Sequence, residues 1–110
     1  MSVGNYKFVL SRAGILYVGF SHSDYHQDIA GISHQEVKAA GYLLWDSDEK
    51  WFPNGKSVGY EIDVNGCEDE VISLLPTTED ALHEEMYVQQ DDEQRPRAKF
   101  WSNNEKRTWF

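Results

Sequence analysis

The sequence predicts a single α+β domain, in which a small and mostly antiparallel sheet carries two or more short helices. Apolar and polar residues alternate in several segments of the first 62 residues. This period of two residues is typical of a half-buried strand. Helix-start signals followed by apolar residues at helical spacing occur between and after these segments. The chain has 110 residues, of which 40% are hydrophobic and 14% aromatic, which is enough for one hydrophobic core.

The N-terminal residues predict a β-hairpin. Apolar Tyr6, Phe8 and Leu10 alternate with the residues between them, as in a strand with one buried face. A three-residue turn, Arg12-Ala13-Gly14, then leads into a second and more buried strand from Ile15 to Phe20.

Two short helices are expected next. Ser23 is placed to cap a helix whose apolar side is Tyr25 and Ile29, and Gly31 would end it. Ser33 and Glu36 have the spacing of a capping box, which predicts a second helix from His34 to Ala40, with Gly41 as its C′ glycine.

The segment that follows predicts two strands joined by a turn. Residues 42–45, Tyr-Leu-Leu-Trp, form an apolar run typical of a strand buried on both faces, and polar residues 46–50 turn the chain. After Pro53-Asn54-Gly55, Val58, Tyr60 and Ile62 alternate with Ser57, Gly59 and Glu61, which predicts a half-buried strand.

Helical spacing returns in the acidic part of the chain. Apolar residues recur from Cys67 to Leu75, and Pro76 would end that helix. Thr78 is placed to cap another helix, from Glu79 to about Tyr87, with Leu82 and Met86 inward and His83 on a solvated face without a partner. The single Cys67 excludes an intramolecular disulfide, which favours a reducing compartment.

The domain is expected to span residues 1–90. Residues 91–98 are polar, carry Pro96 and predict a linker. Residues 99–110 combine aromatic and basic side chains and predict a hairpin or tail that packs back on the domain, because four large aromatic side chains are poorly hydrated.

Charge is the strongest global feature. The net charge is −9, and residues 61–93 hold twelve acids and no Lys or Arg, whereas residues 94–110 hold five bases and one acid. Because phosphate binding depends on clustered Lys and Arg, direct nucleic-acid binding is disfavoured, and a protein with a basic surface is the expected partner. The predicted contact residues are six acids and two aromatic anchors: Glu68, Asp69, Glu79, Asp80, Glu84, Glu85, Trp101 and Trp109. The alternative is that these acids only keep the helix faces hydrated.

A second hypothesis is a metal site. Four side chains of ligand type, His22, Asp24, His26 and Asp28, occur at every second residue, and an extended chain would place them on one face. Imidazole and carboxylate groups suit zinc, so a metal-binding protein or a small hydrolase is the alternative function. The order differs from the H-x-H-x-D-H signature of metallo-β-lactamases, and a polar surface helix explains the same residues. No other cofactor is expected.

Three further motifs are weaker. Residues 31–37 resemble the turn and recognition-helix start of a helix-turn-helix, with residues 42–62 as the wing, but only Lys38 is available for phosphate contacts. Residues 55–59 match G-x-S-x-G, with Asp63 and His83 following Ser57 in triad order. The same residues match the end of a phosphate loop without its first glycine. The strand expected here, in place of a helix, argues against both enzymatic motifs.

A spaced pattern covers residues 20–75: His26-Gln27-Asp28-Ile29-Ala30, Val37 to Tyr42, Gly55-Lys56-Ser57 and Glu68-Asp69-Glu70. It is similar to a pattern in short bacterial and phage proteins of unknown function, and this resemblance implies no catalytic residue. The role that we expect is that of an accessory or inhibitor protein of a phage or mobile element. No charged and apolar leader or membrane-length run is present, so a cytoplasmic protein is expected. A homodimer is also compatible with the sequence. We therefore expect a non-enzymatic protein that binds a basic, nucleic-acid-binding partner.

Overall fold

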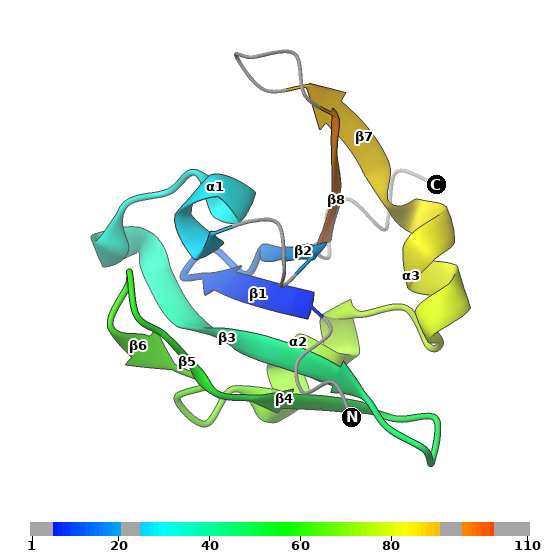
Figure 1. Cartoon of the computed structure of the whole chain (residues 1–110). Helices are drawn as coiled ribbons and strands as arrows, with labels where there is room; N and C mark the ends of the chain where they lie inside the picture. Colours follow the sequence, from blue (N-terminus) through cyan, green and yellow to red (C-terminus); the bar gives the residue numbers. More distant parts are fainter. Residues whose placement is uncertain (1–5, 21–24, 91–95, 103–110) are drawn as a thin grey trace.

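The computed structural model describes residues 6–20, 25–90 and 96–102. Its main element is a six-stranded antiparallel sheet with strand order β4-β3-β1-β2-β8-β7, with short helices packed on it (Figure 1). The predicted α+β class is therefore confirmed. The elements are β1 (Tyr6–Ser11), β2 (Leu16–Phe20), α1 (His26–Ala30), a 3₁₀ turn η1 (His34–Glu36), β3 (Val37–Trp45), β4 (Trp51–Asn54), β5 (Lys56–Ser57), β6 (Ile62–Asp63), α2 (Glu68–Leu74), α3 (Glu79–Glu85), β7 (Tyr87–Gln90) and β8 (Pro96–Ser102).

Strand β1 lies between β2 and β3, and its alternating side chains divide the core into two parts. Tyr6, Phe8 and Leu10 belong to the larger cluster, together with apolar residues of α2 and α3. Val9 belongs to a smaller cluster with Ala40 and Tyr60. Helix α1 and the β5–β6 hairpin therefore contribute to one side of the sheet, whereas α2 and α3 cover the other.

The predicted N-terminal hairpin is confirmed. In the antiparallel β1–β2 pair, Tyr6 lies opposite Phe20 and Leu10 opposite Leu16. The Ser11 hydroxyl accepts a hydrogen bond from the Ile15 N–H at 3.0 Å and closes the turn.

The predicted helix from His34 to Ala40 is wrong beyond its first turn. The Glu36 carboxylate does accept a bond from the Ser33 N–H at 3.1 Å, as in a capping box, but the helical turn ends at Glu36. Strand β3 begins at Val37 and pairs with β1, where Ala40 lies opposite Val9. These long-range backbone bonds override the local helix signal.

Gly41 is therefore a mid-strand glycine and not a helix cap. A Cβ atom at Gly41 would lie 2.6 Å from the carbonyl oxygen of Asn54 in the neighbouring strand. The absence of a side chain allows β3 and the end of β4 to approach each other this closely.

The predicted strand through Val58, Tyr60 and Ile62 is also wrong. The chain forms a two-stranded hairpin in which Ser57 of β5 lies opposite Ile62 of β6, and residues 58–61 make the turn. The Ser57 hydroxyl accepts a bond from the Tyr60 N–H at 3.2 Å, which stabilises that turn. Tyr60 is buried at the turn, whereas Val58 is 84% exposed.

Helices α2 and α3 are confirmed near their predicted positions. The Thr78 hydroxyl accepts the Ala81 N–H at 3.1 Å and caps α3, as expected. Between the two helices, the Pro76 carbonyl accepts a bond from the Trp51 indole at 2.8 Å, which fixes this junction to strand β4. Within the described residues, no helix has both the length and the apolar character needed to cross a membrane.

The C-terminal segment extends the main sheet. Strand β8 starts inside the predicted linker 91–98 and pairs with β2, so that Phe100 lies opposite Val18. Phe100 is 1% exposed and belongs to the larger core cluster. Strand β8 also pairs with β7. The hairpin expected inside residues 99–110 stays a prediction, because most of it lies outside the described residues. Residues 91–95 and 103–110 lie outside the described residues.

Candidate functional site

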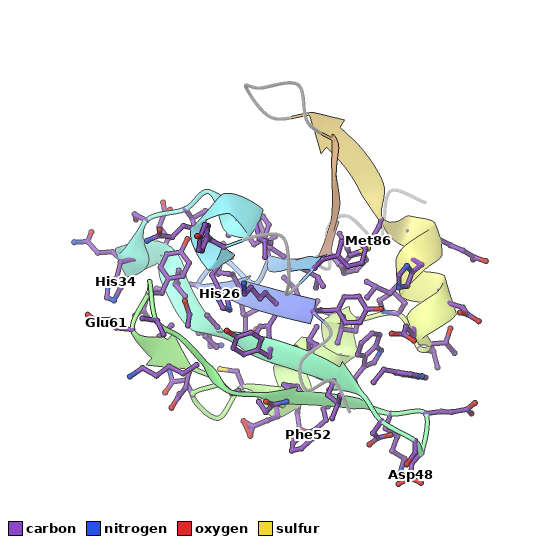
Figure 2. All side chains as sticks on the ribbon, viewed as in Figure 1. His26, His34, Asp48, Phe52, Glu61 and Met86 are labelled. Carbon is purple, nitrogen blue, oxygen red and sulfur yellow. The ribbon has the colours of Figure 1, made fainter. Side chains whose placement is uncertain are left out.

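The structure places only part of the predicted metal cluster. His22 and Asp24 lie outside the described residues, as does the side chain of Asp28. His26 is only 6% exposed, and its Nε2 atom lies 2.7 Å from the carbonyl oxygen of Gly41 (Figure 2). Its ring packs edge-on against Tyr42, with centroids 5.5 Å apart. His26 therefore anchors α1 to β3, and burial lowers the pKa of its imidazole.

No group of three or more His, Cys, Asp or Glu side chains is gathered in metal-binding geometry among the described residues. Because the predicted cluster is described only in part, zinc binding stays a prediction. The other enzymatic motifs have a different local structure from the one that their chemistry requires. Ser57 is buried and is followed by a turn and not a helix. The segment proposed as a recognition helix has one 3₁₀ turn, His34–Glu36, and then continues as strand β3.

The predicted triad partner His83 belongs to a different arrangement, which the sequence did not indicate. The Tyr6 hydroxyl donates to the Glu79 carboxylate at 2.6 Å and lies 2.6 Å from Nε2 of His83. The phenol has one proton, so the His83 Nε2–H donates to the Tyr6 oxygen when Tyr6 donates to Glu79. The expectation that His83 has no partner is wrong, because β1 supplies one from 77 residues away.

Tyr6, which is at the centre of this hydrogen-bond network, is buried among other aromatic rings. Tyr6 is 2% exposed, and its ring packs against Phe20, Trp51 and His83. Burial, followed by the bond to the nearby Glu79 carboxylate, raises the pKa of the Tyr6 hydroxyl well above its ordinary value of 10.0. A phenol that stays protonated and inaccessible joins α3 to the sheet and is unsuited to proton transfer with a substrate.

The predicted acidic contact residues form two groups in the structure. Glu79 is half-buried and already accepts a bond from Tyr6. The five others are exposed on the consecutive helices α2 and α3: Glu68, Asp69, Asp80, Glu84 and Glu85. Within the described residues, the one ion pair joins Lys38 to Glu70 at 2.6 Å, so none of these five carboxylates is paired there. We call these five residues the acidic surface.

The predicted aromatic anchors are placed only in part. The backbone of Trp101 lies in β8, opposite Tyr17 of β2, and its side chain lies outside the described residues. Trp109 lies wholly outside them. Their role as aromatic anchors therefore stays a prediction.

An open groove of about 580 Å³ lies between the end of β4 and the loop that joins β6 to α2. Phe52 and Pro53 line one side, whereas Asp63, Val64, Asn65 and Glu68 line the other. Phe52 is 52% exposed although its two neighbours in the strand, Trp51 and Pro53, are buried. Glu68 belongs both to the groove and to the acidic surface.

The loop side of the groove is held by side-chain bonds. The Asp63 carboxylate accepts the Asn65 N–H at 2.8 Å, and the Asn65 amide donates to the Lys38 carbonyl of β3 at 3.1 Å. Asn65 and Gly66 both have a positive φ, at 54° and 71°, as the Asn-Gly turn requires. The sequence predicts this Asn-Gly turn, but it does not predict that the turn and Phe52 line the same groove.

Comparison with family models, with curated proteins and with solved structures finds no match to this chain.

Proposed function

We propose that this protein is a non-enzymatic binding domain whose acidic surface contacts a basic protein partner. The observation that carries the proposal is the set of five exposed carboxylates on α2 and α3, which have no ion-pair partner within the described residues. A basic protein, such as one that binds nucleic acid, would supply the missing positive charge. An accessory or inhibitor role at such a partner is the form of the function that we favour.

The helices that present these charges are fixed to the core, which supports a preformed contact surface. Val71 and Leu74 of α2 and Leu82 of α3 are buried in the larger core cluster. A surface that is already ordered loses little conformational entropy on binding. The same concentration of negative charge opposes direct contact with nucleic acid, and it opposes self-association through this surface.

The test compares two triple variants that each remove three negative charges. The first is Asp80→Asn, Glu84→Gln and Glu85→Gln on α3, and the matched control is Asp48→Asn, Glu49→Gln and Glu61→Gln in two turns outside the acidic surface. Partners would first be captured from extracts of the native host with the wild-type chain and identified by mass spectrometry. Association rates would then be measured for all three proteins over a range of salt concentrations.

Salt screens charge interactions over about 8 Å at physiological ionic strength, so attraction to the acidic surface should make the wild-type rate fall as salt rises. The α3 variant should bind more slowly and with a flatter salt dependence, while the control behaves like the wild type. If both variants change the rate equally, net charge and not this surface controls binding. If neither changes it, the carboxylates serve hydration and the proposal fails.

A further inference from the structure

We propose that the groove between β4 and the β6–α2 loop binds an arginine side chain of the basic partner, which stacks on Phe52 and pairs with Asp63 and Glu68. This inference rests on the proposed function, and it adds a specific anchor to a surface that otherwise acts through long-range charge.

The apolar side of the groove offers an exposed aromatic ring. Strand β4 lies at an edge of the sheet, and its buried neighbours Trp51 and Pro53 point to the core side, so Phe52 points away from it. Half of the Phe52 side chain remains in solvent, beside Pro53 and Val64. A guanidinium plane that covers this ring would remove apolar surface from water and gain a cation–π contact.

The carboxylates on the acidic side of the groove form no ion pair among the described residues. Lys56 lies opposite Asp63 in the β5–β6 hairpin, but the two form no ion pair. Lys38, whose carbonyl oxygen holds Asn65, directs its ammonium group to Glu70 and not to the groove. Two carboxylates therefore line an open groove in which a cation from outside can be held.

The loop that carries these carboxylates is preorganised. Asn65 is bonded through its backbone N–H to Asp63 and through its side chain to β3, and the Cys67 N–H donates to the Val64 carbonyl at 3.0 Å. A binding loop that is already in place does not have to be ordered when the ligand arrives, which favours affinity.

The combination selects arginine over other occupants. Arginine has a planar, weakly hydrated head that stacks on aromatic rings and forms paired hydrogen bonds with carboxylates. Lysine carries the same charge but has no plane to stack on Phe52. Phosphate groups would be repelled by the two carboxylates, and a second copy of this chain brings a net charge of −9.

The experiment titrates the full ¹⁵N-labelled chain with a blocked Gly-Arg-Gly-Arg-Gly peptide, with the matched lysine peptide as the comparison. We expect the arginine peptide to move the amide signals of Phe52, Gly55, Asn65 and Gly66 more than those of α3. Phe52→Leu keeps apolar area but removes the ring. It should weaken arginine-peptide binding by about 2–5-fold, the range expected for an exposed cation–π contact, and change lysine binding less. Glu68→Gln should weaken binding more than the charge-matched Asp80→Asn.

Several results would overturn the assignment. If the groove signals stay still while α3 signals move, or if Phe52→Leu affects neither peptide, the groove does not hold arginine, and the acidic surface can still be correct. Equal effects of Glu68→Gln and Asp80→Asn would also refute it. The converse outcome is that the groove shows arginine-specific shifts while the captured partner binds the triple α3 variant as fast as the wild type. That outcome would reject the acidic surface. The signal dispersion of each variant shows whether it is folded.

Discussion

Tyr6 shows how one buried hydroxyl can join distant parts of the chain. Its oxygen contacts both Glu79 and His83, one turn apart on α3, while its ring lies in the core. Since α3 has only seven residues, it depends on such tertiary contacts for its position.

Tyr6→Phe should therefore destabilise the protein by about 1–3 kcal/mol, because it removes a hydrogen bond from a buried phenol to a charged carboxylate. Urea unfolding monitored by circular dichroism measures the change. Tyr25→Phe is the matched control, since Tyr25 is exposed, and it should change the free energy of unfolding by about 0.5 kcal/mol or less. A Tyr6→Phe variant as stable as wild type would contradict the network.

The same residue predicts a loss of stability in alkali. The pKa of Tyr6 is raised in the folded state, so the folded protein keeps a proton that the unfolded chain releases. The contribution is complete below the unfolded pKa of 10.0 and decreases as the pH rises above it. Urea midpoints between pH 8 and about 11 should fall more steeply for wild type than for Tyr6→Phe. Parallel curves would show that Tyr6 is not responsible.

His26 predicts the opposite dependence in acid. Burial lowers the pKa of its imidazole, so the unfolded chain takes up a proton before the folded protein does. Stability is complete above the ordinary pKa of 6.5 and falls as the pH drops below it. The exposed His34 provides the control: His26→Gln should flatten the stability profile between pH 7 and about 5, whereas His34→Gln should not. If the His34 variant flattens it equally, the burial argument fails.

At the scale of elements, the pairing of β3 with β4 depends on Gly41. An added Cβ would meet the Asn54 carbonyl at 2.6 Å, so Gly41→Ala should destabilise the protein by about 1–3 kcal/mol through overpacking. Gly59→Ala is the control, because the nearest atom there is a Gln27 side-chain carbon at 3.5 Å. Thermal unfolding of the two variants compares them directly. Equal melting temperatures would mean that β4 shifts without cost.

The elements that the sequence predicts correctly are those defined by local signals. The β1–β2 hairpin has a short turn between alternating strands, and α3 has its Thr78 cap. The helix predicted from His34 and the strand predicted through Val58 fail because their local patterns suit more than one structure. Pairing with β1 decides the first, and the Ser57–Tyr60 bond favours a turn in the second.

The features of the candidate sites are likewise of two kinds, those that follow from local sequence and those that depend on tertiary contacts. Exposure of five acids on α2 and α3 follows from their helical spacing and is predictable. The contact of Tyr6 with His83 and the meeting of Phe52 with the Asn65 turn are not, because they join segments from different parts of the chain. Sequence separation alone gives no measure of such distances.

For the whole molecule, β8 makes the C-terminal segment part of the domain predicted to end at residue 90. Phe100 is buried in the same cluster as Leu16 and Val18 of the neighbouring strand. Phe100→Ala should therefore cost about 3–5 kcal/mol, whereas Val58→Ala, at a site that is 84% exposed, should cost little. Chemical denaturation measures both. A small effect at Phe100 would restore the N-terminal 90 residues as the independent unit.

The pairing of two tryptophans across β3 and β4 gives the molecule an internal optical reporter. Trp45 lies opposite Trp51 with ring centroids 4.9 Å apart and planes inclined at 62°, and the Trp51 indole is bonded to the junction between α2 and α3. Two indoles at this distance and angle couple their electronic transitions. Their coupled dichroism should therefore disappear when β4 separates from β3, even while the far-ultraviolet dichroism of the remaining secondary structure persists.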